Sequence, residues 1–338
     1  MKWKISVKVS LTGVAFKQLQ RTAGYGEASY NIYETFKKLN LDVEIEASKA
    51  DIELCFTDPA NIRFFDPDSY KICYVAWEST DMTKEAKATL NKADEIWATS
   101  PWTADVYKKI FPNKKIFVYK HGINEMWKPK LREKAHKPFT FLHIGEPFSR
   151  KDGQLVVDCF TELFGKDENY RLVMKCSGIN TTRVWNEKYN TLSSPSAEYK
   201  NILEITPPLT PEQMVGLYDL CDVFVYPSWG EGFGFQPLQA LASGMPVIST
   251  ADWADYKKYI NYKIDYSIQK SPWPKVHQGE MMKPDKNSLK QLMLKSVEEY
   301  ESLLKETYKN AFIIHDEYDW IKVSEPAVQR LKDIYKNL

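Results

Sequence analysis

The segment from Asp222 to Thr250 constrains the fold of this chain more than any other, and it reads DVFVYPSWGEGFGFQPLQALASGMPVIST. The apolar run Val223–Tyr226 predicts a buried strand, and the three glycines of Ser228–Gly234 predict a loop that can approach a ligand closely. Pro237–Ser243 has the spacing of a helix with proline in its first turn, and a glycine ends it before a strand at Pro246–Ser249. Such a loop before a helix N-terminus can hold a phosphate, because free N–H groups and the helix dipole both favour an anion.

Two polar residues mark this segment, since Glu231 lies in the loop and Gln239 lies in the helix after it. The segment resembles the donor-binding motif of the retaining "group 1" (family 4-like) glycosyltransferases of GT-B fold, in which an acid, seven residues and a second acid follow one another. Glu231 matches the first acid, whereas Gln239 replaces the second. The resemblance implies that Glu231 is a catalytic residue that orients the transferred sugar, and that Gln239 bonds the ribose hydroxyls more weakly than a carboxylate would. The donor-binding residues that it implies here are Gly232, Phe233, Gly234, Phe235, Gln236 and Gln239. From the residues alone, an ordinary βαβ crossover with a glycine turn is the alternative.

The chain has 338 residues, which is long enough for two domains with separate cores. The resemblance implies an α/β protein of GT-B fold, in which two Rossmann-like domains face a central cleft. We expect an N-terminal acceptor-side domain over residues 1–130, a nucleotide-sugar-binding domain over 138–315, and a C-terminal helix over 316–338 that crosses back onto the first domain. Short apolar runs predict strands at 5–11, 43–46, 52–56, 72–77, 95–99, 116–119, 139–144, 171–175 and 202–206. No element is predicted for the aromatic segment 262–283.

Three features of the first domain are candidate site residues. A glycine-bearing helix start holds Gly24, Tyr25 and Gly26, which the resemblance places at the donor phosphates, although a lone G-x-G fits a plain turn equally well. His121 stands in a Lys-His-Gly-Ile-Asn run similar to the family's H-G-V-D segment, so we expect a catalytic residue beside the donor sugar; a lone histidine at a strand end is otherwise structural. Glu78 follows a strand in a W-E-S-T-D run, where it either contacts the acceptor or stabilises the next helix N-terminus.

The second domain offers a basic pair, Arg150 and Lys151, after its first strand. The family shows G-R-x-x-x-x-K-G at this place, and the resemblance implies that its arginine and lysine hold the donor diphosphate. Lys151 fits the lysine, but Glu146 occupies the arginine position and would repel phosphate. Arg150 can supply the missing charge, because a guanidinium grips phosphate oxygens in a bidentate manner. A solvated basic pair at a helix start is the alternative.

No metal and no cofactor are expected. The triplet Asp66-Pro67-Asp68 is formally a D-x-D, which binds a divalent metal in a different glycosyltransferase fold, but proline and aspartate between strands favour a turn. The five cysteines lack C-x-x-C spacing and stand mostly in apolar runs, so we expect reduced thiols in the cytoplasm. The sequence predicts neither a signal peptide nor a spanning segment, and peripheral association with a membrane stays open.

We therefore expect a glycosyltransferase that moves a hexose or related sugar from a GDP- or UDP-linked donor to a glycan, lipid or protein acceptor, without metal and with retention of configuration. A glycosidase would need two carboxylates, and only one strong candidate is present. A nucleotide-sugar-binding pseudoenzyme is an alternative, because Gln239 and Glu146 both depart from the family at donor contacts. A transferase that acts on modified DNA is another, although a net charge of +1 disfavours a globally basic surface. The lysines that would form its groove are Lys108, Lys109, Lys114, Lys115 and Lys120, but a solvated helix end and loop is the preferred explanation for them.

Overall fold

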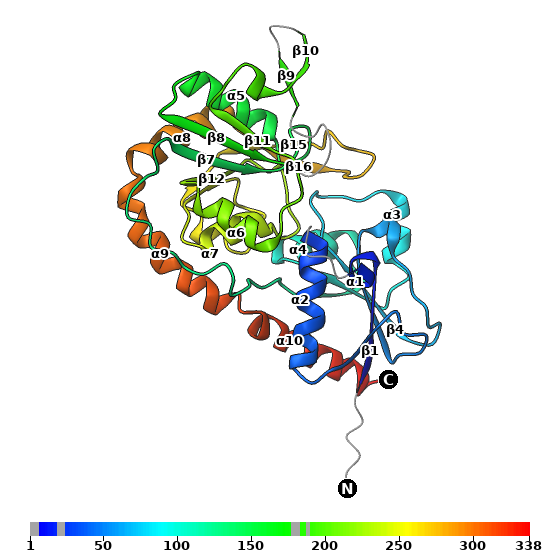
Figure 1. The fold of residues 1–338 in the computed structure, drawn as a ribbon. Helices are drawn as coiled ribbons and strands as arrows, with labels where there is room; N and C mark the ends of the chain where they lie inside the picture. Colours follow the sequence, from blue (N-terminus) through cyan, green and yellow to red (C-terminus); the bar gives the residue numbers. More distant parts are fainter. Residues whose placement is uncertain (1–6, 19–23, 177–182, 187–189) are drawn as a thin grey trace.

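The computed structural model describes residues 7–18, 24–176, 183–186 and 190–338 (Figure 1). Its first half holds a parallel sheet of six strands in the order β2-β1-β3-β4-β5-β6. The strands are β1 (Lys8–Thr12), β2 (Asp42–Ile45), β3 (Ile52–Phe56), β4 (Tyr70–Val75), β5 (Glu95–Ala98) and β6 (Lys115–Val118). The helices of this half are α1 (Val14–Gln18), α2 (Gly24–Lys38), α3 (Lys84–Leu90) and α4 (Pro101–Ile110). Each strand lies within two residues of its predicted range, except that the first was expected from Ile5, and residues 5–6 lie outside the described residues.

The second half holds another parallel sheet of six strands, in the order β11-β8-β7-β12-β13-β14. This is the strand order of a Rossmann fold, in which ligands bind beyond the carboxyl ends of the strands. The strands are β7 (Phe139–Ile144), β8 (Tyr170–Lys175), β11 (Ile202–Ile205), β12 (Val223–Tyr226), β13 (Val247–Ser249) and β14 (Tyr262–Lys263). The helices are α5 (Gly153–Phe164), α6 (Pro211–Asp219), α7 (Phe235–Ala242) and α8 (Lys286–Glu298), with single 3-10 turns at Pro195–Ala197 and Lys257–Tyr259; a further 3-10 turn, Pro59–Asn61, belongs to the first half.

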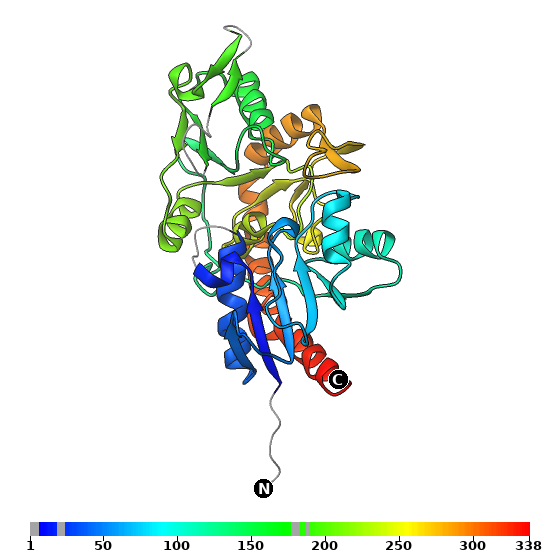
Figure 2. The ribbon, with the colours of Figure 1, turned by 90° about the vertical axis from the view of Figure 1, so that its right-hand side faces the viewer.

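The C-terminal helices connect the two halves. Helix α9 (Tyr300–Glu317) leaves the second half, and α10 (Trp320–Tyr335) packs on α2 of the first (Figures 1 and 2). Arg330 of α10 forms a bidentate ion pair with Glu95 of β5, with nitrogen–oxygen distances of 2.6 and 3.0 Å. The returning C-terminal helix is confirmed. The boundaries 1–130, 138–315 and 316–338 stay predictions, into which the first sheet, the second sheet and α10 fall respectively.

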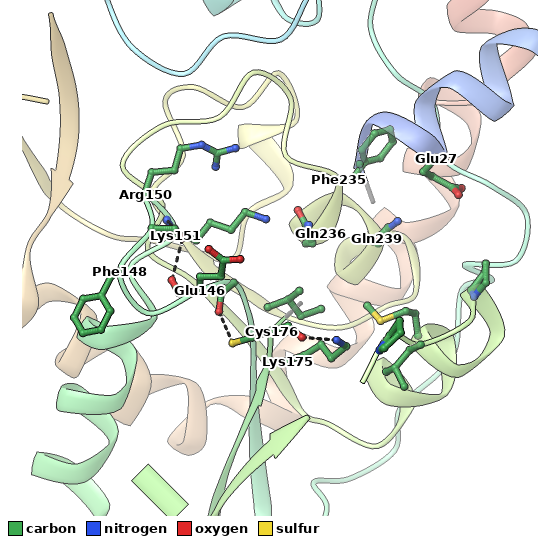
Figure 3. A pocket seen from close by; sticks show the side chains of 18 of the residues that line it. Glu27, Glu146, Phe148, Arg150, Lys151, Lys175, Cys176, Phe235, Gln236 and Gln239 are labelled. Atoms are coloured by element: carbon green, nitrogen blue, oxygen red, sulfur yellow. Dashed lines mark hydrogen bonds between the residues drawn. The ribbon is translucent and has the colours of Figure 1, made fainter. Parts of the chain in front are cut away.

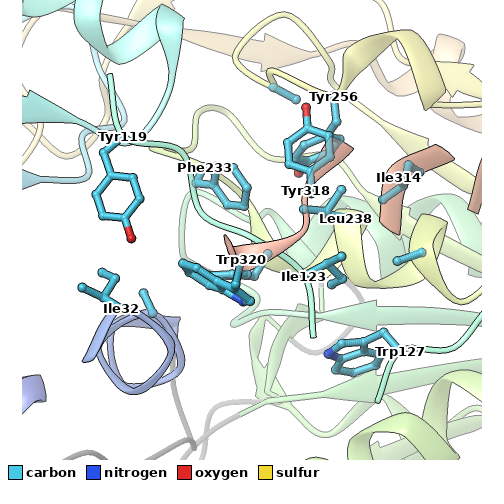
Figure 4. Packing of buried hydrophobic residues seen from close by; sticks show 14 of the residues in the cluster. Ile32, Tyr119, Ile123, Trp127, Phe233, Leu238, Tyr256, Ile314, Tyr318 and Trp320 are labelled. Atoms are coloured by element: carbon cyan, nitrogen blue, oxygen red, sulfur yellow. The ribbon is translucent and has the colours of Figure 1, made fainter. Parts of the chain in front are cut away.

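A hydrophobic cluster joins the halves where α9 turns into α10. Figure 4 shows Tyr119 of the first half, Phe233 and Tyr256 of the second, and Trp320 of α10 around this junction. A Cβ atom on Gly122 would lie 2.7 Å from the Trp320 ring, so only glycine fits beneath this indole. In the described residues, no helix is both long and apolar enough to span a membrane.

Two hairpins were not predicted. One, β9 (Val184–Asn186) with β10 (Thr191–Ser193), lies in an insertion of the second half. The other, β15 (Tyr266–Lys270) with β16 (Glu280–Pro284), extends toward α3 of the first half in Figure 1. Its tip meets the loop after β4 in an antiparallel bridge between Asp81 and Gln278. This second hairpin therefore gives the two halves a direct backbone connection.

Candidate functional site

A cavity of about 840 Å³ lies between the halves, at the carboxyl edge of the second sheet. Its wall follows the sheet order, from the α6 start after β11, across the ends of β8 and β7, to the start of α7 after β12. The described residues of this wall include Pro208, Leu209, Pro211, Met214, Lys175, Cys176, Gly145, Glu146, Phe148, Ser149, Arg150, Lys151, Phe235, Gln236 and Gln239 (Figure 3). The first half adds Gly24, Glu27, Met126 and Trp127. The cavity is thus a cleft at the place where open α/β sheets bind ligands.

Arg150 and Lys151, the basic pair predicted to hold a phosphate, both line this cavity (Figure 3), and their role stays a prediction. The ammonium of Lys151 lies 5.7 Å from the centre of the Tyr226 ring. Burial lowers the pKa of Lys151, and the nearby carboxylate of Glu231 opposes this shift. Glu146 also lines the cavity, so the carboxylate at the family's arginine position does face the candidate site.

Arg150 connects two carboxylates that come from different halves. Its Nη1 atom pairs with Oε1 of Glu231, and its Nη2 atom lies 3.3 Å from Oε1 of Glu78. Glu231 is 5% exposed and also accepts hydrogen bonds from the hydroxyls of Tyr226 (2.6 Å) and Ser228 (3.0 Å). All three donors bond Oε1, and in the part of the chain that the structure describes no hydrogen bond to Oε2 is found. That second oxygen therefore keeps an open acceptor position, although Glu231 itself is not among the described residues that line the cavity.

The environment moves the pKa values of these two carboxyl groups in opposite directions. Burial raises the pKa of Glu78 to about 7, and the opposing effect of Arg150 is smaller. Burial acts on Glu231 in the same sense, but Arg150, Lys151 and the two hydroxyls outweigh it, so the pKa of Glu231 lies below its ordinary value.

The proposal that Glu78 stabilises the next helix N-terminus is wrong, because Thr83 caps α3 by accepting from the Ala86 N–H.

His121 lies in an aromatic cage and is 3% exposed. Its ring stacks on Phe235 at 4.9 Å and meets the edge of Phe233 at the same distance, while Nδ1 lies 3.2 Å from the Tyr74 hydroxyl. Burial lowers the pKa of His121 to about 3, so the imidazole is neutral. His121 is not part of the cavity wall but supports Phe235, which is, and its place beside a donor sugar stays a prediction.

The glycines of the central loop fit against the first half of the chain. A Cβ on Gly230 would lie 2.1 Å from the Glu78 carbonyl oxygen, and one on Gly232 would lie 2.6 Å from the Ala76 Cβ. Gly234 has a φ of +78° and begins α7 without a side-chain cap. The cavity wall therefore does not include Gly232, Phe233 or Gly234, which pack behind it. It does include Phe235, Gln236 and Gln239.

The other predicted glycine motif is only partly at the cavity. Gly24 opens α2 and lines the cavity, with its nearest outside neighbour, Phe235, at 3.9 Å from where a Cβ would stand. The ring of Tyr25 packs on Phe56 at 4.8 Å, and Gly26 is buried inside the helix. Of these three residues, Gly24 is the one that lines the cavity.

Sequence reasoning missed several residues of the cavity wall. Lys175 is 4% exposed at the end of β8, and its ammonium donates to the Cys176 carbonyl at 2.6 Å. Glu27, in the first turn of α2, accepts from the side chains of Asn31 and Asn124. The hairpin β15–β16 contributes Trp273, Val276 and His277. Nothing in the sequence marks Lys175, because a lysine at a strand end is ordinarily solvated.

The acidic triplet and the cysteines have structural environments. The carboxylates of Asp66 and Asp68 both pair with Lys49, at 2.9 and 3.2 Å, and Asp66 accepts from the Asp68 N–H, as the turn interpretation predicts. Among the described residues, no group of three or more His, Cys, Asp and Glu side chains is arranged to hold a metal. All five cysteines are free and buried.

Comparisons with known proteins agree with this architecture. Residues 126–263 match the family described as Glycosyl transferases group 1. The fold is similar to sucrose-phosphate synthase from Thermosynechococcus elongatus, with 12% identity, a TM-score of 0.68 and coverage of 98% of this chain and 100% of that one. It is also similar to WaaG, a glycosyltransferase involved in lipopolysaccharide biosynthesis, with 13% identity, a TM-score of 0.64 and coverage of 96% and 99%.

Sequence relatives match over shorter stretches. A D-inositol 3-phosphate glycosyltransferase of Corynebacterium efficiens is 30% identical over 114 residues, which are 33% of this chain and 26% of that protein. Another relative, named as glycosyltransferase 45, comes from Sulfolobus islandicus filamentous virus. It is 23% identical over 243 residues, which are 69% of this chain and 65% of the viral protein. The chain thus covers less than two thirds of the length of either relative.

Proposed function

We propose, from the premise that this chain belongs to the group 1 glycosyltransferases and has the GT-B fold, that it transfers a sugar from a nucleoside-diphosphate donor bound between its halves. One observation carries the proposal: three cationic side chains, Arg150, Lys151 and Lys175, line a single cavity at the start of α7. A diphosphate leaving group needs such a place, because negative charge develops on its oxygen as the glycosidic bond breaks.

The diphosphate would lie between the basic loop and α7. Gly234 gives the first turn of α7 no side-chain cap, so the first N–H groups of this helix can donate to an anion. Lys151 and Lys175 supply point charges, and Arg150 supplies a guanidinium fork. Because these groups can stabilise the leaving oxygen together, we propose transfer without a metal ion.

The sugar would lie at the β12 end of the cavity, near Glu231. The Oε2 atom of this carboxylate can accept from a sugar hydroxyl while Oε1 stays fixed by Arg150, Tyr226 and Ser228. The nucleoside would extend toward the α6 start, with its ribose hydroxyls at Gln239. We further propose that the donor is a GDP- or UDP-linked hexose or related sugar, that the acceptor is a glycan, a lipid or a protein, and that transfer retains the configuration. Glu78, the first-domain carboxylate beside Arg150, is the proposed acceptor contact.

A DNA acceptor is less well supported by the lysine cluster. The Lys108 ammonium pairs with Asp105 at 2.9 Å, and that of Lys114 donates to the carbonyls of Asn91 (2.8 Å) and Ala93 (2.5 Å). Lys120 pairs with Asp255 at 3.0 Å. Three of the five lysines therefore already have protein partners and would have to exchange them for phosphates.

The test combines binding with turnover. Melting temperature is measured with UDP, GDP and their sugar conjugates in EDTA, since a ligand that binds only the folded state raises it. We expect stabilisation by one base and its sugar conjugate, and acceptor-dependent release of that diphosphate. Lys151→Ala should weaken nucleotide binding at least tenfold, whereas Lys166→Ala, an exposed lysine outside the cavity, should not.

Three outcomes would contradict parts of the proposal. No stabilisation by any nucleotide at millimolar concentration would overturn the donor site. Binding without release of the diphosphate across a broad acceptor panel would favour the pseudoenzyme. Activity that disappears in EDTA and returns with a divalent metal would overturn metal independence.

A further inference from the structure

The hairpin β15–β16 crosses from the second half to the first at the sugar end of the cavity. Two backbone bonds, from Thr80 N to Glu280 O (3.1 Å) and from Asp81 N to Gln278 O (3.2 Å), attach its tip to the loop after β4. The Glu280 N–H also donates to the Thr80 hydroxyl at 2.7 Å. Gly279, with a φ of +80°, leaves no room for a Cβ, which would lie 2.6 Å from the Thr80 hydroxyl oxygen. The tip is thus held in one position against the first half.

The tip lies beside the loops after β7 and β12, at the opposite end of the wall from the α6 start. Trp229, which follows β12, donates its indole N–H to Asp152 at 2.8 Å, and its backbone N–H bonds the Arg150 carbonyl at 2.8 Å. The Trp273 ring meets Trp229 edge-on at 5.7 Å. Because the nucleoside is proposed at the α6 end, a sugar attached to its diphosphate would point toward this tip.

The three hairpin residues in the cavity wall can contact a sugar ring. Trp273 is partly exposed and Val276 is 58% exposed, which leaves apolar surface for the C–H face of a pyranose. His277 packs edge-on against Trp77 at 5.2 Å, and its Nδ1 atom lies 3.6 Å from Glu78 Oε2. This nitrogen is buried without a hydrogen-bond partner among the described residues. Burial and the nearby Arg150 lower the pKa of His277 to about 4, so the ring is neutral and can both donate and accept.

We propose that this hairpin is a sugar-recognition element, in which Trp273 and Val276 pack on a pyranose ring and His277 hydrogen-bonds its hydroxyls. The inference rests on the proposed function and deepens it by naming residues that select the sugar. The ring belongs either to the donor sugar or to the terminal sugar of an acceptor. Both sources present the same surface, and the experiment distinguishes them.

The experiment compares Trp273→Ala and His277→Ala with the unaltered chain in three arms. The first arm measures binding of the free nucleoside diphosphate, which we expect to change less than twofold. The second measures binding of the nucleotide sugar, and the third measures KM for the acceptor. A loss of about tenfold or more in the second arm assigns the donor sugar, and the same loss in the third arm alone assigns the acceptor sugar.

A docking variant tests the hairpin without altering its cavity side chains. Gly279→Ala should detach the tip from Thr80 and produce the same pattern as the cavity variants. Gly165→Ala is the matched control: Gly165 also has positive φ (+52°), but a Cβ there would meet only the Thr161 carbonyl, at 3.9 Å. Both substitutions place alanine at a positive φ, so both strain the backbone. The fall in melting temperature that the two variants have in common measures this strain, and a change in sugar binding seen only with Gly279→Ala is due to detachment of the tip.

The outcomes separate this inference from the proposed function. If the diphosphate binds and the hairpin variants leave both sugar arms within twofold of the unaltered chain, the hairpin inference is overturned while the donor site stands. If hairpin variants weaken the free diphosphate as much as the nucleotide sugar, the hairpin acts on the whole cleft and does not recognise the sugar. If no diphosphate binds at all, both proposals fail together.

Discussion

Replacing Glu78 with glutamine should stabilise the protein at alkaline pH, although it removes one member of an ion pair. Glu78 shares the guanidinium of Arg150 with Glu231, and burial raises the pKa of Glu78 from 4.5 to about 7. The folded state therefore holds a proton on Glu78 that the unfolded state releases between pH 4.5 and 7. This proton contributes stability that is fully present below pH 4.5 and is lost as pH rises through 7. Glutamine has the same shape and carries no charge to bury.

The size of the effect follows from the two pKa values. The shift from 4.5 to about 7 corresponds to about 3 kcal/mol between the ionised and neutral forms. Glu78→Gln should therefore gain up to about 3 kcal/mol at pH 8.5, and less than about 0.5 kcal/mol at pH 4.5. At roughly 2 °C per kcal/mol for a large domain, the melting temperature at pH 8.5 should rise by about 6 °C.

The assay is thermal unfolding of both proteins from pH 4.5 to 8.5, with Glu231→Gln as the matched control. The pKa of Glu231 is lowered, so this second substitution removes a charge that the fold stabilises and should destabilise at neutral and alkaline pH. The reasoning would be refuted if Glu78→Gln lowered the melting temperature at pH 8.5 by as much as Glu231→Gln does. That result would mean that the ion pair with Arg150 outweighs the cost of burying the carboxylate.

Three further predictions concern other parts of the structure. Three buried histidines have pKa values of about 3, 4 and 4, so acidification from pH 7 to 5 should destabilise the fold, seen as a lower urea midpoint, because their combined effect exceeds the stabilisation from protonating Glu78. They are His121, His143 and His277. Arg330→Ala should cost about 3 kcal/mol, because it leaves Glu95 charged and 1% exposed, whereas Lys322→Ala, which breaks an exposed pair, should cost less than about 0.5 kcal/mol in the same unfolding assay. Gln239→Glu should tighten binding of the preferred nucleotide about tenfold in calorimetry but leave its 2′,3′-dideoxy analogue unchanged; equal gains for both would show that the residue does not contact the ribose diol.

The sequence predicted the elements whose side chains alternate or repeat clearly. The buried run Val223–Tyr226 is β12, as predicted. The helix after it was expected from Pro237 but begins two residues earlier, at Phe235, because Gly234 takes the N-cap position. The hairpin β15–β16 gave no such signal. Four of the five residues of β15 are exposed and the fifth is half-buried, so the strand lacks the alternation that identifies a half-buried strand.

Contacts between the halves could not be predicted, because they depend on how two separate sheets meet. Local sequence shows an acid after β4 and a basic pair after β7, but not that Glu78 and Arg150 lie 3.3 Å apart across 72 residues. The same limit explains the glycines of the central loop. Their spacing suggested an approach to a ligand, whereas the neighbour that requires Gly230 and Gly232 is the backbone of Ala76–Glu78.

The position of Arg150 between two carboxylates would link the proposed donor binding to the contact between the halves. To bind a diphosphate with its whole guanidinium, Arg150 would have to release Glu78, the weaker of its two partners. Because Arg150 lowers the pKa of Glu78, its departure would raise that pKa further. Protonation of Glu78 would compensate, since a neutral carboxyl needs no counter-ion. We propose that Arg150 takes the place of the arginine that the family carries where this chain has Glu146. Arg150 is held by Glu231, which accepts hydrogen bonds from Tyr226 and Ser228. The proposed donor cation, Arg150, and the proposed sugar contact, Glu231, thus belong to one hydrogen-bonded group, so a change to either is expected to alter both the diphosphate and the sugar contacts.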